Sequence, residues 1–289
     1  MKQTESKQAN QSNDSGASQE PEDSGTPARI IDLDSWLQTP IGNYVRAWEQ
    51  RHLDVLTTDI FGFNAVQIGL PQINALNANR MPYRWLTDAS VPQNGQDGQD
   101  AQEGRSVPLV VTHDFSELPF ASQSLDLVVL PHVLEFSAEP HQVLREVERV
   151  LIPEGQVIIC GFNPVSLWGA RQAVGRLTGA HFLPQDGEFI ALPRLKDWLK
   201  LLNMEVNRGH FGCYAPPCDT DKWLQRFAFM EKAGDRWWPY FGAVYIVQAI
   251  KRVKGMRLIG PAWRKQKVKV PKGVPATNRS HKDRMPPGR

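Results

Sequence analysis

Residues 109–169 read LVVTHDFSELPFASQSLDLVVLPHVLEFSAEPHQVLREVERVLIPEGQVIICGFNPVSLWG. Apolar runs of strand length lie at its start, middle and end, at Val107–Thr112, Leu125–Leu130 and Val157–Phe162. Runs of this kind are typical of parallel strands buried on both faces. The segment Pro140–Leu151 between two of them is expected to be an amphipathic helix, since its apolar residues recur at helical spacing. The stretch therefore predicts an α/β fold.

The same alternation continues on both sides of this stretch. Upstream, Asn64–Gly69 and Tyr83–Thr87 are expected strands, and Gln72–Asn77 is expected to begin a helix between them. Downstream, Glu205–Phe211 and Ala243–Lys251 are expected to close the sheet. Further helices are expected at Val165–Leu177, at Leu192–Leu202 and near Asp219–Lys232. The pattern predicts seven strands in a mostly parallel sheet with helices on both faces.

A helical pair precedes the first strand. Leu33, Trp36 and Leu37 form a short apolar stripe, and Pro40 opens a second helix. The apolar face of the second helix is expected to hold Ile41, Tyr44, Val45, Trp48, Leu53 and Leu56. We expect this N-terminal pair to pack on the edge of the sheet.

Composition divides the chain into one domain and two polar tails. Residues 1–27 and 254–289 are expected to be disordered, and residues 28–253 to form the domain, with a low-complexity loop at 89–106. Residues 251–289 hold 13 Lys/Arg and one acid, so they carry +12, and the other 250 residues carry −10. A solvated tail is favoured over a nucleic-acid contact, because no aromatic residue follows Trp263 for base stacking. Nucleic-acid modification guided by this tail is the lowest-ranked hypothesis of function.

Cysteine usage and hydropathy exclude several classes of protein. Cys160, Cys213 and Cys218 cannot form a disulfide framework, so a reducing cytoplasm is expected. No apolar run approaches the ~20 residues that span a bilayer, and the N-terminus lacks the apolar core of a secretory signal. His210, Cys213 and Cys218 lack a fourth ligand and a Cys-x-x-Cys pair, so no metal is predicted. Nothing in the sequence indicates an oligomeric state.

Within residues 109–169, motifs follow one another in a recognisable order. An Asp after the third strand precedes Leu-Pro-Phe, an Asp precedes the fourth strand, and His-Val-Leu-Glu follows it. Leu-Arg-Glu-x-x-Arg-Val-Leu and the turn Pro153-Glu154-Gly155, where Pro-Gly-Gly is usual, lead to the fifth strand. The stretch closely resembles the class I S-adenosylmethionine-dependent methyltransferases of the type 11 small-molecule group. The resemblance implies a Rossmann-like fold, S-adenosylmethionine as cofactor and a small-molecule methyl acceptor.

Two acidic residues at strand ends are candidates for holding this cofactor. Asp114 with Phe115 fits an adenine, offering a hydrogen-bond acceptor and an apolar contact. Asp88 closes the second strand and fits a ribose diol. The alternatives are ordinary turn chemistry, with Asp114 capping the next turn and Asp88 opening the low-complexity loop.

The methyl-transfer position implied by the resemblance is Pro131-His132, after the fourth strand. His132 can orient the substrate or accept a proton from it, and Glu135 is a second candidate. The alternative is that His132 only begins the next short helix. Asp126 is expected to satisfy backbone groups at the strand entry, and Asn163 to be a turn residue.

The glycine motif departs from the family pattern. Acidic-x-Gly-x-Gly is here Gln67-Ile68-Gly69-Leu70-Pro71. Gly69 keeps the close backbone approach that the methionine end of the cofactor requires, and Gln67 can hydrogen-bond its ammonium without a charge. Pro71 is tolerable in the first turn of a helix. This departure motivates a second hypothesis, a binding or regulatory protein with the methyltransferase fold and no catalysis.

Overall fold

The computed structural model describes residues 31–88, 110–112, 115, 117–178, 182–184, 187–217 and 220–253. These residues contain a seven-stranded sheet in the order β3-β2-β1-β4-β5-β7-β6. The strands are β1 (Asn64–Ile68), β2 (Tyr83–Asp88), β3 (Val110–Thr112), β4 (Leu125–Pro131), β5 (Leu151–Phe162), β6 (Met204–Gly212) and β7 (Val244–Lys251). The seven-stranded sheet expected from the sequence is confirmed.

The helices are α1 (Ile31–Trp36), α2 (Pro40–Thr58), α3 (Val133–Phe136), α4 (Pro140–Val150), α5 (Leu167–Thr178), α6 (Leu192–Leu201), α7 (Asp221–Arg226) and α8 (Phe229–Trp237), with a 3₁₀ turn η1 (Pro239–Phe241). Thr39 caps α2, because its hydroxyl accepts a hydrogen bond from the Gly42 N–H at 3.1 Å, and Pro40 suits the first turn.

The two edges of the sheet differ in the direction of their strands. Strands β1 to β5 are parallel, whereas β7 is antiparallel to both β5 and β6. The strand order reverses between β1 and β4, since β2 and β3 follow on one side of β1 and β5 follows on the other side of β4. In open α/β sheets, ligands bind outside the carboxyl ends of the strands at this switch point.

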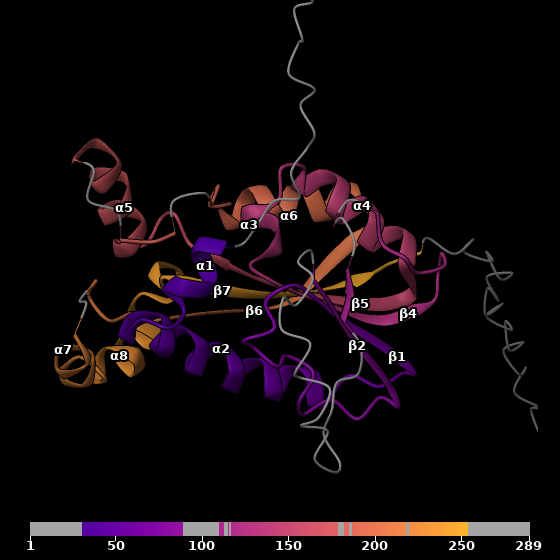
Figure 1. Cartoon of the computed structure of the whole chain (residues 1–289), viewed down its shortest axis with the longest axis horizontal. Helices are drawn as coiled ribbons and strands as arrows, with labels where there is room; N and C mark the ends of the chain where they lie inside the picture. Colours follow the sequence, from indigo (N-terminus) through magenta and orange to yellow (C-terminus); the bar gives the residue numbers. More distant parts are fainter. Residues whose placement is uncertain are drawn as a thin grey trace, which may run out of the picture. The chain divides into compact units, whose positions relative to one another are not determined.

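Two apolar clusters cover the two faces of the sheet. On one face, α1 and α2 pack with residues of β1, β4 and β5, including Ala65, Leu127 and Cys160. On the other face, α4 and α6 pack on the alternate residues of the same strands. Figure 1 shows α2 on one side of the sheet and α4 and α6 on the other. The expectation that the N-terminal pair packs on the sheet edge is wrong, because its apolar face covers the central strands.

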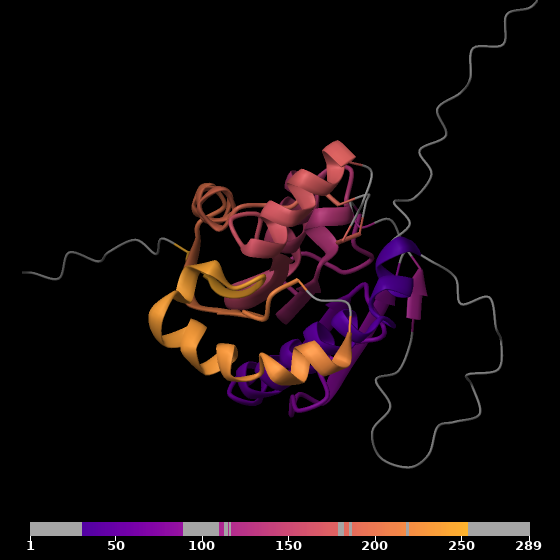
Figure 2. The same ribbon diagram turned by 90° about the vertical axis from the view of Figure 1, so that its left-hand side faces the viewer.

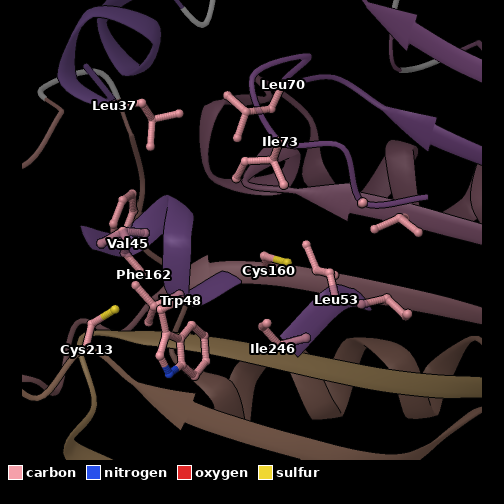
Figure 3. Packing of buried hydrophobic residues seen from close by; sticks show 14 of the residues in the cluster. Leu37, Val45, Trp48, Leu53, Leu70, Ile73, Cys160, Phe162, Cys213 and Ile246 are labelled. Carbon is pink, nitrogen blue, oxygen red and sulfur yellow. The ribbon is translucent and has the colours of Figure 1, made fainter. Parts of the chain in front are cut away.

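The connection from β1 to β2 differs from the sequence prediction. No helix begins at Gln72–Asn77, and the segment runs in turns. Leu70 has a φ of 52°, and its side chain and that of Ile73 are buried. Figure 3 shows both with Leu53 of α2 and Cys160 of β5 in the same cluster. The apolar spacing predicts a helix in this segment. Helix α2 already covers this face of the sheet, so the connection contributes buried side chains to the cluster without forming a helix.

The two tails, predicted to be disordered, and the predicted low-complexity loop at 89–106 lie outside the described residues, so these stay predictions. Of the helices that the structure describes, none combines the length and the apolar character needed to cross a bilayer.

Candidate functional site

His132 lies at the switch point, directly after β4, and connects three elements. Its backbone is left-handed, with a φ of 55°, and its N–H donates to the Cys160 carbonyl of β5 at 3.1 Å. Its ring is completely buried. Nδ1 lies 2.9 Å from Oε2 of Glu135, and Nε2 lies 2.8 Å from Oε1 of Glu49 on α2. The structure thus joins α2, β4 and α3 in one Glu49–His132–Glu135 cluster.

Burial and charge act in opposite directions on this imidazole. Burial alone would lower the pKa of His132, but attraction to Glu49 and hydrogen bonds to Glu135 and Glu49 outweigh it and raise the pKa to about 10. The imidazole is therefore protonated at neutral pH and donates to both carboxylates. Burial also raises the pKa of Glu135, against the opposing effect of the His132 hydrogen bond. Glu135 is held further by the Phe162 N–H, at 2.5 Å from its Oε1.

Glu49 was missed by sequence reasoning, and its carboxylate is the least satisfied group of the cluster. The residue is completely buried. Within the described part of the chain, its Oε2 has no hydrogen-bond partner. A signal was present in the sequence, because Glu49 falls four residues after Val45 and four before Leu53, on the apolar stripe of its helix. An acid at such a position needs a buried partner, which is His132.

Gln67 holds the turn after β1. Its Nε2 lies 3.1, 3.0 and 2.7 Å from the carbonyl oxygens of Gly69, Leu70 and Ile73, and its Oε1 accepts from the Ala75 N–H at 2.8 Å. The side chain is almost fully buried. These bonds use the amide within the chain, so the observed role of Gln67 is to fold the loop. Its predicted contact with a cofactor stays a prediction.

The other predicted site residues that the structure describes lie along the edge of the sheet where the parallel strands end. Gly69 has a φ of 72° directly after β1, and its N–H donates to the Thr87 carbonyl of β2 at 2.6 Å. Pro131 ends β4, and Asp88 ends β2, although only the backbone of Asp88 is described. Phe115 is buried in the second cluster. Asp114 lies outside the described residues, so its predicted role is untested.

Two further residues have structural roles in agreement with the sequence predictions. Asp126 Oδ2 accepts from the Phe63 and Asn64 N–H groups at 3.0 and 2.9 Å, and so holds the start of β1. Asn163 Oδ1 accepts from the Val165 N–H at 3.1 Å, as expected of a turn residue. Cys160 is buried in the core. In the described ranges, no three His, Cys, Asp or Glu residues are grouped so as to hold a metal ion.

Comparison with known protein sequences gives a consistent picture. A family model described as a methyltransferase domain matches residues 86–159. The uncharacterized protein YafS of Escherichia coli (strain K12) is 33% identical over 181 residues, which cover 62% of this chain and 68% of YafS. A malonyl-[acyl-carrier protein] O-methyltransferase of Laribacter hongkongensis (strain HLHK9) is 28% identical over 49% of this chain, and the match spans about half (47%) of that enzyme.

Among solved structures, a complex between the Haloferax volcanii Trm112 methyltransferase activator and a putative methyltransferase contains a similar chain. It has a TM-score of 0.55 and 16% identity, and the match covers 78% of this chain and 97% of that one. At this identity the likeness concerns the fold, which agrees with the strand order and the motifs of residues 109–169. The chain belongs to the class I S-adenosylmethionine-dependent methyltransferases, in the type 11 group.

Proposed function

We propose that this protein transfers a methyl group from S-adenosylmethionine to a small-molecule acceptor. The observation that carries the proposal is the buried Glu49–His132–Glu135 cluster at the switch point. When both carboxylates are ionised and His132 is protonated, the cluster has one negative charge in excess. A buried carboxylate oxygen without a partner is costly, and a cationic ligand would satisfy it. The residues present therefore fit a cofactor with a sulfonium and an ammonium group.

The chain would hold this cofactor with residues from several strand ends. Asp114 and Phe115 would contact the adenine, Asp88 the ribose diol, and the backbone around Gly69 and Pro131 the methionine end. Glu49 would face the cationic part. When bound, S-adenosylmethionine supplies a methyl group that its sulfonium already activates. The main contribution of the protein is then to align donor and acceptor, which can account for a large share of a rate enhancement.

The geometry favours a positioning role for His132 over proton abstraction. A general base must be unprotonated and within reach of the acceptor. The His132 imidazole is protonated at neutral pH, and both its nitrogens contact carboxylates. We propose that His132 fixes Glu49 and Glu135 beside the position of methyl transfer. The cytoplasmic location expected from the cysteine content is part of the same proposal.

Cofactor binding tests the proposal directly. S-adenosylmethionine and S-adenosylhomocysteine should each bind in calorimetry and raise the melting temperature. Asp114→Ala should weaken the affinity about 10- to 100-fold, because one hydrogen bond to the adenine amine is lost. Glu117→Ala, an exposed acid three residues away, is the matched control and should bind as the wild type does. Absence of binding at millimolar ligand would overturn the enzyme hypothesis and favour the catalytically inactive alternative.

Glu49→Gln separates the two cationic groups that Glu49 could face. The variant keeps an acceptor for His132 but loses the charge, so we expect about a tenfold loss of S-adenosylmethionine affinity. S-adenosylhomocysteine has the ammonium without the sulfonium. An equal loss for both ligands assigns Glu49 to the ammonium, and a loss confined to S-adenosylmethionine assigns it to the sulfonium. Asp54→Asn on the same helix is the control. Unchanged affinity for both would remove Glu49 from the site.

A further inference from the structure

Exposed aromatic side chains gather on the segment that joins β6 to β7. We call them the aromatic surface: Trp223, Phe229, Trp237, Trp238, Tyr240 and Phe241. Each is between 49% and 70% exposed. In the rest of the described chain, the exposed aromatic residues are Phe61, Phe63 and Tyr83. Monomeric proteins rarely keep such a concentration of apolar surface without an interaction that uses it.

Helix α8 has a clear inner and outer side. On the inner side, the Glu231 carboxylate accepts hydrogen bonds from the Cys213 and Tyr214 N–H groups at 2.9 and 3.1 Å. Gly234, three residues later, lies against the Tyr214 ring. Phe229, Lys232 and Arg236 are spaced by three and four residues and lie exposed on the outer side, and Trp237 is exposed at the end of the helix. Basic and aromatic side chains thus share the outer face.

The outer face carries a positive charge. Lys222, Arg226, Lys232 and Arg236 are all exposed. The Arg226 guanidinium lies 5.6 Å from the centre of the Trp223 ring, over its face. The Glu231 carboxylate is hydrogen-bonded on the inner side of α8. The remaining acidic residues of α7 and α8 are Asp221 and Asp235, and the four basic residues outnumber them. The sequence of residues 254–289 is also strongly basic.

The aromatic surface is fixed to the carboxyl edge of the sheet. Asn163, directly after β5, donates from Nδ2 to the carbonyl oxygens of Tyr240 and Gly242 at 2.9 and 3.0 Å. Tyr44 of α2 donates from its hydroxyl to Glu231 of α8 at 2.5 Å. Figures 1 and 2 show α7 and α8 beside α2. The surface therefore borders the edge on which the candidate site lies.

We propose that the aromatic surface docks on an anionic lipid bilayer. Trp and Tyr prefer the interface between headgroups and acyl chains, and Lys and Arg beside them attract anionic lipid. The contact would be peripheral, with the helices lying in the interface. A second copy of the chain fits less well, because two basic faces would oppose each other. A nucleic-acid strand also fits less well, because the four rings within residues 237–241 have no basic residue between them to meet phosphates, and the basic residues lie on the helices that precede them.

Vesicle flotation with the full chain tests the proposal. The wild type should float with vesicles of phosphatidylcholine and phosphatidylglycerol, bind poorly to phosphatidylcholine alone, and be released by high salt. The double variant Trp237→Ser/Trp238→Ser should lose at least about tenfold in vesicle affinity, because two interfacial rings are removed. The matched control is Phe61→Ser/Phe63→Ser, which also removes two exposed rings and should bind normally.

The remaining outcomes overturn the proposal. Equal vesicle binding by the double variant would show that the basic tail alone attracts lipid. Tryptophan-dependent binding to single-stranded RNA, with no flotation, would favour a nucleic-acid partner. Tryptophan-dependent self-association in sedimentation velocity, again with no flotation, would favour a second copy. Circular dichroism and the melting temperature of each variant show that it is folded, and cofactor binding is measured separately, so failure of the proposed function is distinguishable.

Discussion

His132→Asn should lower the free energy of unfolding by about 3–5 kcal/mol, because it leaves two buried carboxylates without their cation. Asparagine tolerates the left-handed backbone of this position, so the change tests the side chain and not the turn. Its shorter amide cannot span the distance between Glu49 and Glu135. Urea unfolding at neutral pH, followed by tryptophan fluorescence, measures the loss. His141→Asn is the control, because this residue is exposed on α4 and its ring contacts the Trp198 ring at 4.0 Å, so the loss should be no more than about 1 kcal/mol.

A double-mutant cycle shows whether the cluster acts as a unit. The combination Glu49→Gln/His132→Asn should cost less than the sum of the two single variants, because the first removes a charge that the second leaves unpaired. Strict additivity would mean that Glu49 and His132 do not stabilise each other and that the contact at 2.8 Å contributes no net energy.

The same cluster gives the stability a specific dependence on pH. The pKa of His132 rises from 6.5 in the unfolded chain to about 10 in the folded one. Its contribution to stability is therefore complete below pH 6.5, decreases as the pH rises and is lost above about pH 10. Burial raises the pKa of Glu135, which acts in the same direction. The wild type should lose stability between neutral pH and pH 10, and His132→Asn should show a flatter profile.

Gln67→Glu should destabilise the protein by at least about 3 kcal/mol, although it restores the acidic residue usual in the family. The Gln67 amide nitrogen faces three carbonyl oxygens at 2.7–3.1 Å. A carboxylate at this position would place buried negative charge against those oxygens and leave them without a donor. Urea unfolding measures the effect, and Gln38→Glu, at an exposed position, is the control.

Cofactor binding distinguishes the two roles considered for Gln67. If the side chain only folds the loop, Gln67→Glu should lose stability and gain no affinity for S-adenosylmethionine. A stable variant with higher affinity would show that the carboxylate reaches the ammonium and that the hydrogen bonds observed here are dispensable.

Much of the fold could be predicted because its strands are apolar and its helices have regular spacing. The strand expected at Leu125–Leu130 is observed as β4 (Leu125–Pro131). The helix expected at Pro140–Leu151 is observed as α4 (Pro140–Val150). Buried parallel strands need continuous apolar residues, and a helix between sheet and solvent needs apolar residues with a period of about 3.6. Both patterns can therefore be recognised in a single sequence. The turn at Pro153-Glu154-Gly155 proved to be an irregularity within β5, where Glu154 has a φ of 65°.

Features that depend on distant contacts could not be predicted. Leu70, Ile73 and Leu76 have helix-compatible spacing, but the Gln67 side chain binds the carbonyl groups that a helix would use. Likewise, the partner of Glu49 is 83 residues away in the sequence. Apolar periodicity reports which side of an element is buried. It does not report which element covers that side, so the place of α2 on the sheet and its acidic contact were both missed.

The positions of the candidate residues could be predicted where they depend on strand ends, whereas their roles stay predictions. Gly69, Pro131 and His132 follow apolar runs, and parallel strands bring such residues to one edge. The roles of Asp88 and Asp114 stay predictions, and a single sequence could not distinguish a pocket residue from a turn residue at either position.

The position of β7 has a consequence for the order of assembly. β7 is the last strand along the described chain, yet it lies between β5 and β6. Within this sheet β6 pairs with β7 alone, and β7 covers the free side of β5. A nascent chain therefore presents β5 with an open side, and β6 without a partner, until Val244–Lys251 leaves the ribosome. Unpaired strand edges promote aggregation, so this interval is when the newly made protein most needs protection by a chaperone.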